Sequence, residues 1–279
     1  MKKISLNGFD IGNNEAFTLI AGPCAAESHE QLVFLATEIK KITDELGINF
    51  IFKASFDKAN RTTIYNDRGL GLEKTMAAFK EIREKLGIPT TTDMHLPEQA
   101  EMIAPYVDII QIPAFLARQT DLLIAAAKTG KIVSIKSPQF VKKEENGRIA
   151  QKVIDSGNEK VMLIERGTFN GDRVFVDPLA FPKLKEFKHP VILDSTHPVQ
   201  LRDNNGESIG QLQKYVLGLA KLGISQKIAG VFMEVHENPQ KAICDRSQQF
   251  YLANLKDALI QLKELDNIIK KQPEIKVGM

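Results

Sequence analysis

The sequence predicts an α/β fold in which eight parallel strands close into a (β/α)8 barrel, the TIM barrel. Short apolar runs alternate with amphipathic stretches of helical periodicity along nearly the whole 279-residue chain. Strands that alternate with helices in this way indicate βαβ units and a parallel sheet. Eight such units in about 260 residues match a closed barrel better than an open doubly wound sheet. No GxGxxG motif follows the first strand, which argues against a dinucleotide-binding fold.

The predicted elements follow one another regularly. Residues 1–14 are predicted to contain a hairpin, with Asn7-Gly8 as its turn. The strands are predicted at 17–21, 50–54, 89–93, 107–112, 132–136, 161–165, 190–194 and 229–234. The main helices are predicted at 30–46, 71–86, from 97, 120–129 and 249–270, three of them closed by Gly47, Gly87 and Gly130. No linker or low-complexity segment divides the chain, so we expect a single domain over residues 1–279.

Composition narrows the classes of protein. With 43% apolar and 26% charged residues the chain can bury a substantial core. The net charge of +2, with acids and bases interspersed, gives no indication of nucleic-acid binding. No apolar run approaches the roughly 20 residues needed to cross a bilayer, and the N-terminus lacks a signal-peptide core. The only cysteines, Cys24 and Cys244, form no CxxC pair, so we expect a cytoplasmic protein with reduced thiols.

Polar side chains follow every predicted strand. The active sites of (β/α)8 barrels lie at the carboxyl ends of the strands. The residues at these ends are Cys24, Lys53, Ser55, Asp93, His95, Gln111, Lys136, Glu165, Arg166, Asp194, His197, Glu234 and His236. All eight ends therefore carry groups that can bind ions or transfer protons, which predicts a site at this end of the barrel.

Five cations would converge on this end of the barrel: Lys53, Lys58, Arg61, Lys136 and Arg166. A phosphate monoester carries about −1.5 to −2 charges at neutral pH. The set therefore suits two phosphates, or a phosphate with a carboxylate, better than a neutral ligand. The alternative for any one cation is an ion pair with a neighbouring acid, as Glu165 could provide for Arg166.

A second constellation consists of Cys24, His197, Glu234 and Asp245. Barrel closure makes the first, seventh and eighth strand ends neighbours. A thiolate, an imidazole and two carboxylates suit a borderline divalent metal, namely Zn, Fe, Co or Mn. From spacing alone, the alternative of a small buried cysteine and an unrelated histidine is favoured. His236 is a competing ligand, His95 could contact a ligand or a substrate, and His29 and His189 are interpreted as surface residues.

Six blocks of sequence resemble one known family. They are IAGPCAAES (20–28), FKASFDKANRTT (52–63), TDMHLPEQA (92–100), DIIQIPAFLARQTDLL (108–123), GNEKVML (157–163) and MEVHENP (233–239). Together they are similar to the 3-deoxy-D-manno-octulosonate 8-phosphate synthases. KANRT and PAFLARQTDLL are specific to that family, whereas GPC also occurs in the related heptulosonate phosphate synthases.

The resemblance implies a transferase that condenses phosphoenolpyruvate with arabinose 5-phosphate and water, a step towards lipopolysaccharide. No organic cofactor is implied. By motif, phosphoenolpyruvate would be held by Lys53, Lys58, Lys136 and Arg166, with Gln111, Pro113 and Ala114 lining its pocket. Arabinose 5-phosphate would be bound by Asn60 and Arg61, with Ser55 and Asp93 nearby. Lys53, Lys136, Asp93 and His197 are the candidate catalytic residues.

The residue after GP divides the family into two classes. One class has asparagine there and needs no metal, whereas the other has cysteine and binds a divalent ion. Cys24 is thereby identified as a metal ligand, and His197, Glu234 and Asp245 match the other three positions. Because the family is commonly tetrameric, the resemblance also implies a homotetramer.

The chain departs from the family pattern at several positions. Ser137 stands where the family usually has a second lysine, and the segments 169–177 and 203–212 are altered. These changes leave open a relative that acts on another aldose phosphate, such as erythrose 4-phosphate. A barrel with a decayed site that serves as a scaffold is the alternative outside enzymes.

Overall fold

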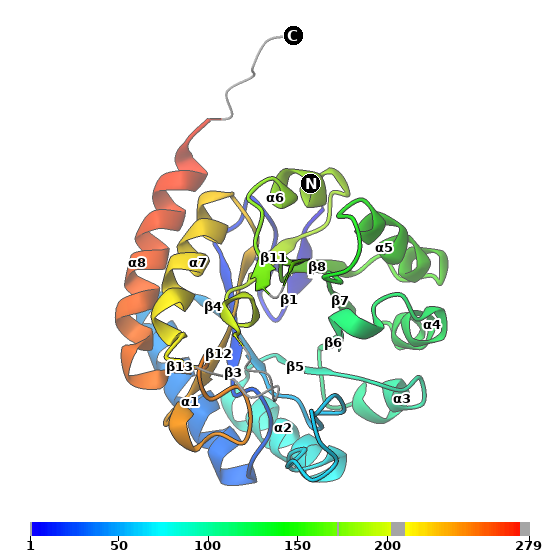
Figure 1. Ribbon diagram of the computed structural model, residues 1–279, viewed down its shortest axis with the longest axis vertical. Helices are drawn as coiled ribbons and strands as arrows, with labels where there is room; N and C mark the ends of the chain where they lie inside the picture. Colours follow the sequence, from blue (N-terminus) through cyan, green and yellow to red (C-terminus); the bar gives the residue numbers. More distant parts are fainter. Residues whose placement is uncertain (1, 172, 202–209, 274–279) are drawn as a thin grey trace.

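The computed structural model describes residues 2–171, 173–201 and 210–273. Eight parallel strands form a closed ring, in which β11 pairs with β12 and β12 pairs with β3 (Figure 1). The ring strands are β3 (Thr18–Gly22), β4 (Asn49–Lys53), β5 (Thr90–Asp93), β6 (Ile109–Ile112), β7 (Ile132–Lys136), β8 (Val161–Glu165), β11 (Val191–Asp194) and β12 (Gly230–His236). This closure confirms the predicted (β/α)8 barrel.

The helices surround the ring of strands (Figure 1). They are α1 (His29–Leu46), α2 (Leu72–Leu86), α3 (Gln99–Ile103), α4 (Thr120–Lys128), α5 (Glu145–Asp155), α6 (Ala180–Glu186), α7 (Gln213–Ser225) and α8 (Leu252–Lys271). Short 3-10 turns occur at η1 (Ala114–Leu116), η2 (His197–Val199) and η3 (Pro239–Lys241). Among the described residues, no helix is both long and apolar enough to pass through a lipid bilayer.

The predicted bounds are close to those observed, with one difference near the C-terminus. The last helix begins at Leu252 instead of residue 249, because Phe250 and Tyr251 form a short strand, β13 (Phe250–Tyr251). This strand pairs in parallel with Val235 and His236, which extends β12 beyond the ring. The loop that carries Asp245 is thereby held between two paired strands.

The interior of the barrel explains where the polar residues lie. Side chains two apart on a strand face the same side. Ile51, Ile109, Ile192 and Phe232 are buried together inside the ring, away from the larger cluster between strands and helices. Two residues further on, each of these strands carries a polar side chain: Lys53, Gln111, Asp194 and Glu234. These groups therefore form the layer directly above the apolar interior.

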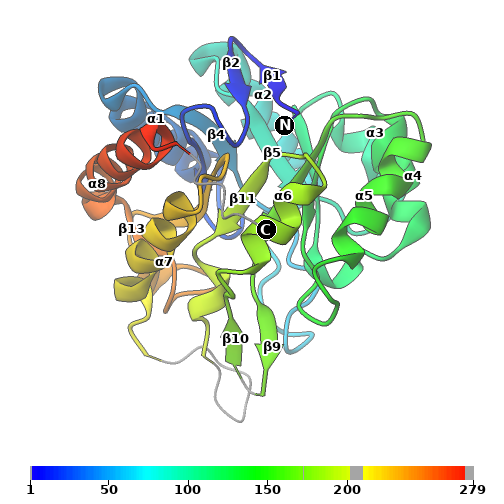
Figure 2. The same cartoon turned by 90° about the horizontal axis from the view of Figure 1, so that it is seen from above.

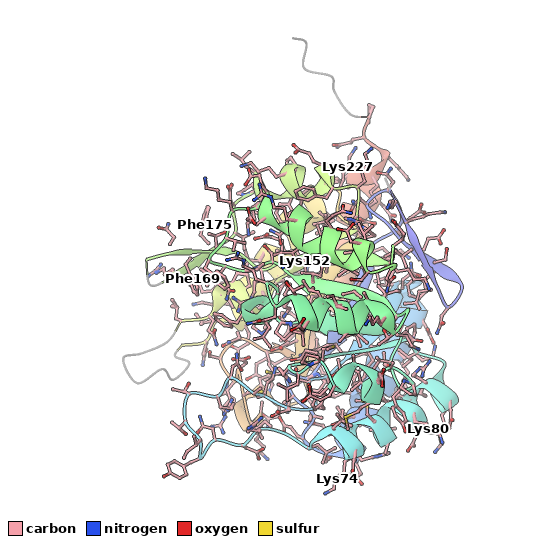
Figure 3. The ribbon with its side chains drawn as sticks, turned by 90° about the vertical axis from the view of Figure 1, so that its right-hand side faces the viewer. Lys74, Lys80, Lys152, Phe169, Phe175 and Lys227 are labelled. Carbon is pink, nitrogen blue, oxygen red and sulfur yellow. The ribbon has the colours of Figure 1, made fainter. Side chains whose placement is uncertain are left out.

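Hairpins lie at opposite ends of the barrel (Figure 2). The predicted N-terminal hairpin is confirmed as β1 (Ile4–Leu6) and β2 (Phe9–Ile11), and its Ile4 and Ile11 are buried against the apolar interior. The second hairpin, β9 (Thr168–Asn170) and β10 (Arg173–Phe175), was not predicted. Figure 3 shows its Phe169 and Phe175 projecting beyond the body of the barrel.

Candidate active site

A cavity of about 200 Å³ opens at the carboxyl ends of the barrel strands, and we call it the inner cavity. Every residue predicted to bind substrate lines it, with the single exception of Arg61. Its lining residues include Lys53, Ser55, Lys58, Asn60, Asp93, His95, Gln111, Pro113, Ala114, Phe115, Lys136, Arg166, His197 and Glu234. The lining residues thus come from seven different strand ends.

A second cavity of about 450 Å³ adjoins the first, and we call it the outer cavity. The two share Lys58, Asn60, Phe115, Arg166 and His197. The remaining lining residues of the outer cavity are Arg61, Thr62, Gln139, Phe169, Val174, Gln200, Cys244 and Asp245. The site is therefore one elongated space with an inner and an outer end.

Two buried lysines reach the inner cavity from β4 and β7. Nζ of Lys53 donates to the carbonyl of Cys24 at 2.9 Å and lies 3.3 Å from Oε1 of Glu234. Nζ of Lys136 lies 2.8 Å from Oδ2 of Asp194 and 4.1 Å from the centre of the Phe232 ring. Burial lowers the pKa of Lys136, although Asp194 opposes this effect. Each ammonium thus has one acidic partner and still borders the cavity.

Gly22 allows the ends of β3 and β4 to approach closely. Its φ is +150°, and a Cβ there would lie 2.0 Å from the carbonyl oxygen of Lys53. Only glycine fits such a close backbone contact. The contact places Cys24, two residues later, beside Lys53.

Lys58 and Arg166 lie where the two cavities meet. Burial alone would lower the pKa of Lys58, but Cys24, Glu234, Cys244 and Asp93 together raise it well above its ordinary value. Burial lowers the pKa of Arg166, with Asp194, Asp245 and Glu234 opposing. Its Nη1 is buried without a hydrogen-bond partner among the described residues, and Glu165 pairs with Lys143 instead. A buried unsatisfied guanidinium is suited to binding an anion.

Arg61 lies at the outer end of the site. Its Nη2 donates to the carbonyl of Ile243 at 3.1 Å, while its buried Nε has no partner within the part of the chain that the structure describes. Asn60 lines both cavities. Lys53 and Lys136 therefore line only the inner cavity, Lys58 and Arg166 lie where the cavities meet, and Arg61 lies at the outer end.

A cluster of possible metal ligands borders both cavities. Candidate ligand atoms of Cys24, Glu234 and Asp245 all lie within 4.8 Å of one another. Sγ of Cys24 donates to Oδ2 of Asp245 at 3.1 Å. Nε2 of His197 lies 3.6 Å from Oε1 of Glu234 and 3.9 Å from Oδ2 of Asp245. The four predicted ligands are thus neighbours, with His197 at the edge of the group.

The chemistry of this cluster fits a divalent cation. Burial raises the pKa of the Cys24 thiol well above its ordinary value, and Cys244, Asp245 and Glu234 raise it further. Oε2 of Glu234 is buried and has no hydrogen-bond partner among the described residues. Thiolate, carboxylate and imidazole donors together suit a borderline metal ion. A cation bound here would neutralise the crowded acidic groups.

Asp194, which was predicted only as one of the polar strand-end residues, joins the lysine and the histidine of the site. Its Oδ2 lies 2.7 Å from Nδ1 of His197 and 2.8 Å from Nζ of Lys136. Its Oδ1 accepts from the backbone amides of Thr196 and His197. Burial would raise the pKa of Asp194, but His197, Lys136 and Arg166 hold it well below its ordinary value. The signal for this role is the strand alternation, which turns Asp194 inward above Ile192.

Asp93 and His95 form a pair on the opposite wall of the inner cavity. Nε2 of His95 lies 3.1 Å from Oδ2 of Asp93, whose Oδ1 is buried without a partner among the described residues. Burial would raise the pKa of Asp93, but the hydrogen bond from His95 and nearby lysines hold it well below its ordinary value. The pair presents a carboxylate that can accept hydrogen bonds from a ligand.

Comparison with known proteins identifies the family. The profile of the DAHP synthetase I family matches residues 2–271. The chain belongs to this family. It is 42% identical over 278 residues to a 2-dehydro-3-deoxyphosphooctonate aldolase of Pseudomonas fluorescens (strain SBW25), covering 99% of each chain. Aldolases of the same name are 42% identical in Vibrio cholerae, over 99% of each chain, and 45% identical in Bartonella henselae, over 95% of each chain.

Other histidines of this DAHP synthetase I family member lie outside the cluster of possible metal ligands. Nε2 of His236 forms a hydrogen bond with the side chain of Gln31 in α1 and lies 3.3 Å from Oε1 of Glu27. The partners of His236 are therefore different from the possible metal ligands. His29 pairs with Glu81 at the surface. The interpretation of His189 as a surface residue is wrong, because it is 4% exposed. Asn13, 176 positions earlier, donates to the carbonyl of His189, and sequence alone does not reveal this contact.

Two predicted features are only partly described. Residues 203–209 of the altered segment 203–212 lie outside the described residues, as does Asp172 of the segment 169–177. Within the segment 169–177, Phe169 and Val174 line the outer cavity. The departures from the family pattern around β9 and β10 therefore reach the site itself.

Proposed function

We propose that the chain condenses phosphoenolpyruvate with arabinose 5-phosphate and water, giving 3-deoxy-D-manno-octulosonate 8-phosphate and inorganic phosphate. The observation that carries this proposal is the division of the cations between two joined cavities. The relatives are named for 2-dehydro-3-deoxyphosphooctonate, which is another name for this eight-carbon product. Phosphate release from the two substrates by the purified protein is the direct test.

The inner cavity suits phosphoenolpyruvate. Its cations, Lys53, Lys58, Lys136 and Arg166, offer positive charge for one phosphate and one carboxylate. Gln111, Pro113 and Ala114 would contact the flat enol. Arabinose 5-phosphate would extend into the outer cavity, with its phosphate on Asn60 and Arg61 and its hydroxyls near Ser55 and Asp93. The aldehyde end would then point towards the inner cavity.

The reaction proposed forms one carbon–carbon bond and replaces the carbon–oxygen bond between C2 and the phosphate with one to the oxygen of water. C3 of the enol attacks the aldehyde carbon, whose oxygen takes up a proton, while water adds to C2 and loses one proton. The tetrahedral intermediate then expels phosphate as its C2 hydroxyl loses the second proton, and C2 becomes a ketone. Lys136 and Arg166 would stabilise the charge on the carboxylate and the departing phosphate. Asp194 holds His197 through Nδ1, so that Nε2 faces Glu234 and Asp245, where it would bind the metal proposed below.

We also propose that Cys24, His197, Glu234 and Asp245 hold a divalent metal: Zn, Fe, Mn or Co. When bound, such an ion supplies Lewis acidity and orientation for an aldehyde or a water. The donor set and the unsatisfied oxygen of Glu234 support this assignment. Metal analysis of the purified protein, before and after dialysis against dipicolinate, tests it independently of turnover.

Another aldose phosphate is the second candidate for the sugar substrate. The altered hairpin contributes Phe169 and Val174 to the outer cavity, where the sugar phosphate would end. Phosphate release with arabinose 5-phosphate and erythrose 4-phosphate, each at equal concentration, distinguishes the two. The homotetramer and the cytoplasmic location remain predictions, which analytical ultracentrifugation and cell fractionation can test.

A further inference from the structure

Lys143 lies outside both cavities and joins the ends of two barrel strands. It belongs to the loop between β7 and α5 and is 8% exposed. Its Nζ donates to Oε1 of Glu165 at 2.7 Å, to Oγ of Ser137 at 3.3 Å and to the carbonyl of Gly167 at 3.4 Å. Because Lys143 lines neither the inner nor the outer cavity, substrate contact does not account for its burial.

Arg166 lies between two of the groups that Lys143 holds. Oε1 of Glu165 accepts both from Lys143 and from the backbone amide of Gly167, each at 2.7 Å. Glu165 is fully buried away from the cavities, whereas Arg166 lines both of them. The backbone on each side of Arg166 is therefore fixed by one carboxylate, and Lys143 neutralises that carboxylate.

The ammonium of Lys143 is also linked to the end of β7, which carries Lys136, another cation of the inner cavity. Ser137, which is fully buried, directly follows Lys136 and contacts Nζ of Lys143. One buried charge thus fixes the relative position of the strand ends that carry Lys136 and Arg166.

The hairpin at the outer cavity begins at this network. A Cβ at Gly167 would lie 2.4 Å from Cγ1 of Val174, so β10 packs directly against this glycine. The amide of Phe169 donates to the carbonyl of Gln139 at 3.1 Å. Phe169 and Val174 in turn line the outer cavity. The network around Lys143 therefore supports one wall of the site.

We propose that Lys143 is a positioning residue that aims the guanidinium of Arg166 at the anion of the bound substrate. It acts by holding Glu165, Ser137 and Gly167 together and touches no substrate. The inference rests on the proposed function, since the anion concerned is phosphoenolpyruvate. It predicts that Lys143 affects phosphoenolpyruvate affinity only through Arg166.

A double-mutant cycle tests this dependence. Phosphoenolpyruvate affinity is measured by titration calorimetry for wild type, Lys143→Met, Arg166→Lys and the double variant, with melting temperatures recorded for each. We expect Lys143→Met to weaken binding about tenfold or more, because a displaced guanidinium loses charge-assisted hydrogen bonds to the anion. In the Arg166→Lys background the same change should have little further effect. Lys143→Arg should restore most of the affinity, and exposed Lys142→Met is the matched control.

Three outcomes overturn the proposal. Equal weakening by Lys143→Met in both backgrounds would show that Lys143 acts independently of Arg166. Unchanged affinity in Lys143→Met would show that it has no positioning role. Failure of the wild type to bind phosphoenolpyruvate would overturn the proposed function and this inference with it. If Lys143→Met does not fold, the double variant Lys143→Gln with Glu165→Gln, which removes both charges, replaces it in the cycle. An equal loss of phosphoenolpyruvate affinity in the wild-type and Arg166→Lys backgrounds, or no loss, would then overturn the proposal.

Discussion

The carboxylate of Asp194 lies 2.8 Å from the ammonium of Lys136, inside the barrel and out of contact with solvent. The same oxygen lies 2.7 Å from Nδ1 of His197, whose other nitrogen faces Glu234 and Asp245. One buried carboxylate thus connects a cation of the inner cavity with the cluster of possible metal ligands. Changes at Asp194 should therefore affect both anion binding and metal binding.

Asp194→Asn should leave the ammonium of Lys136 buried without an acidic partner. Breaking a buried ion pair destabilises a protein by about 3–5 kcal/mol, so we expect a loss of that order in unfolding free energy. Because a histidine ligand loses its orienting carboxylate, metal affinity should also fall about 10–100-fold. Urea unfolding and metal titration measure the two effects, with exposed Asp257→Asn as the control. Wild-type values for both would show that Asp194 has no such role.

Acid stability follows from the lowered pKa of Asp194. A carboxyl group whose pKa is lower in the folded than in the unfolded state stabilises the fold above the unfolded value of about 3.9. This contribution is lost as the pH falls below about 4 towards the folded value. The difference in unfolding free energy between wild type and Asp194→Asn should therefore shrink between about pH 5 and pH 3. A difference independent of pH over this range would contradict the assignment.

Cys24→Asn should impair metal retention. Removing a group that only hydrogen-bonds to a metal ligand weakens metal affinity about 10–100-fold. Removing the thiolate ligand itself should therefore weaken metal affinity at least about 100-fold. Metal content by mass spectrometry after dialysis measures this, and thermal unfolding checks that the variant is folded. A variant that retains as much metal as wild type would remove Cys24 from the ligand set.

Arg61→Ala should act mainly on the sugar phosphate. Because Arg61 lines only the outer cavity, we expect the KM for arabinose 5-phosphate to rise about tenfold or more, and that for phosphoenolpyruvate to change much less. Arg68→Ala is the matched control, since Arg68 lies in the same loop, pairs with Asp57 and lines neither cavity. Equal changes in both KM values would place Arg61 elsewhere in the mechanism.

Much of the fold was predictable because short apolar runs followed by stretches of helical periodicity repeat along the chain, with Gly47, Gly87 and Gly130 marking three of the helix ends. The residues that line the inner cavity were predictable as well, since the carboxyl end of a barrel strand faces the site. Lys53, Gln111 and Glu234 each lie two positions beyond an interior apolar residue, so their direction follows from the strand period.

The partners of these residues were not predictable. The predicted strand 190–194 places Asp194 at a strand end, but only the three-dimensional structure shows that it meets both Lys136 and His197. Lys143 lies in a polar loop segment, where nothing in the sequence distinguishes it from exposed Lys142. The strands β9 and β10 have three residues each, too few for a periodic pattern to appear.

The most direct measurement is phosphate release from phosphoenolpyruvate plus arabinose 5-phosphate, before and after treatment with dipicolinate and after addition of Mn or Zn. We predict release that is lost with the chelator and restored by metal. Release that is unaffected by the chelator would preserve the reaction but contradict an essential metal at Cys24. No release from these substrates or from erythrose 4-phosphate, under any of the conditions, would contradict the proposed reaction and favour a scaffold role for the barrel.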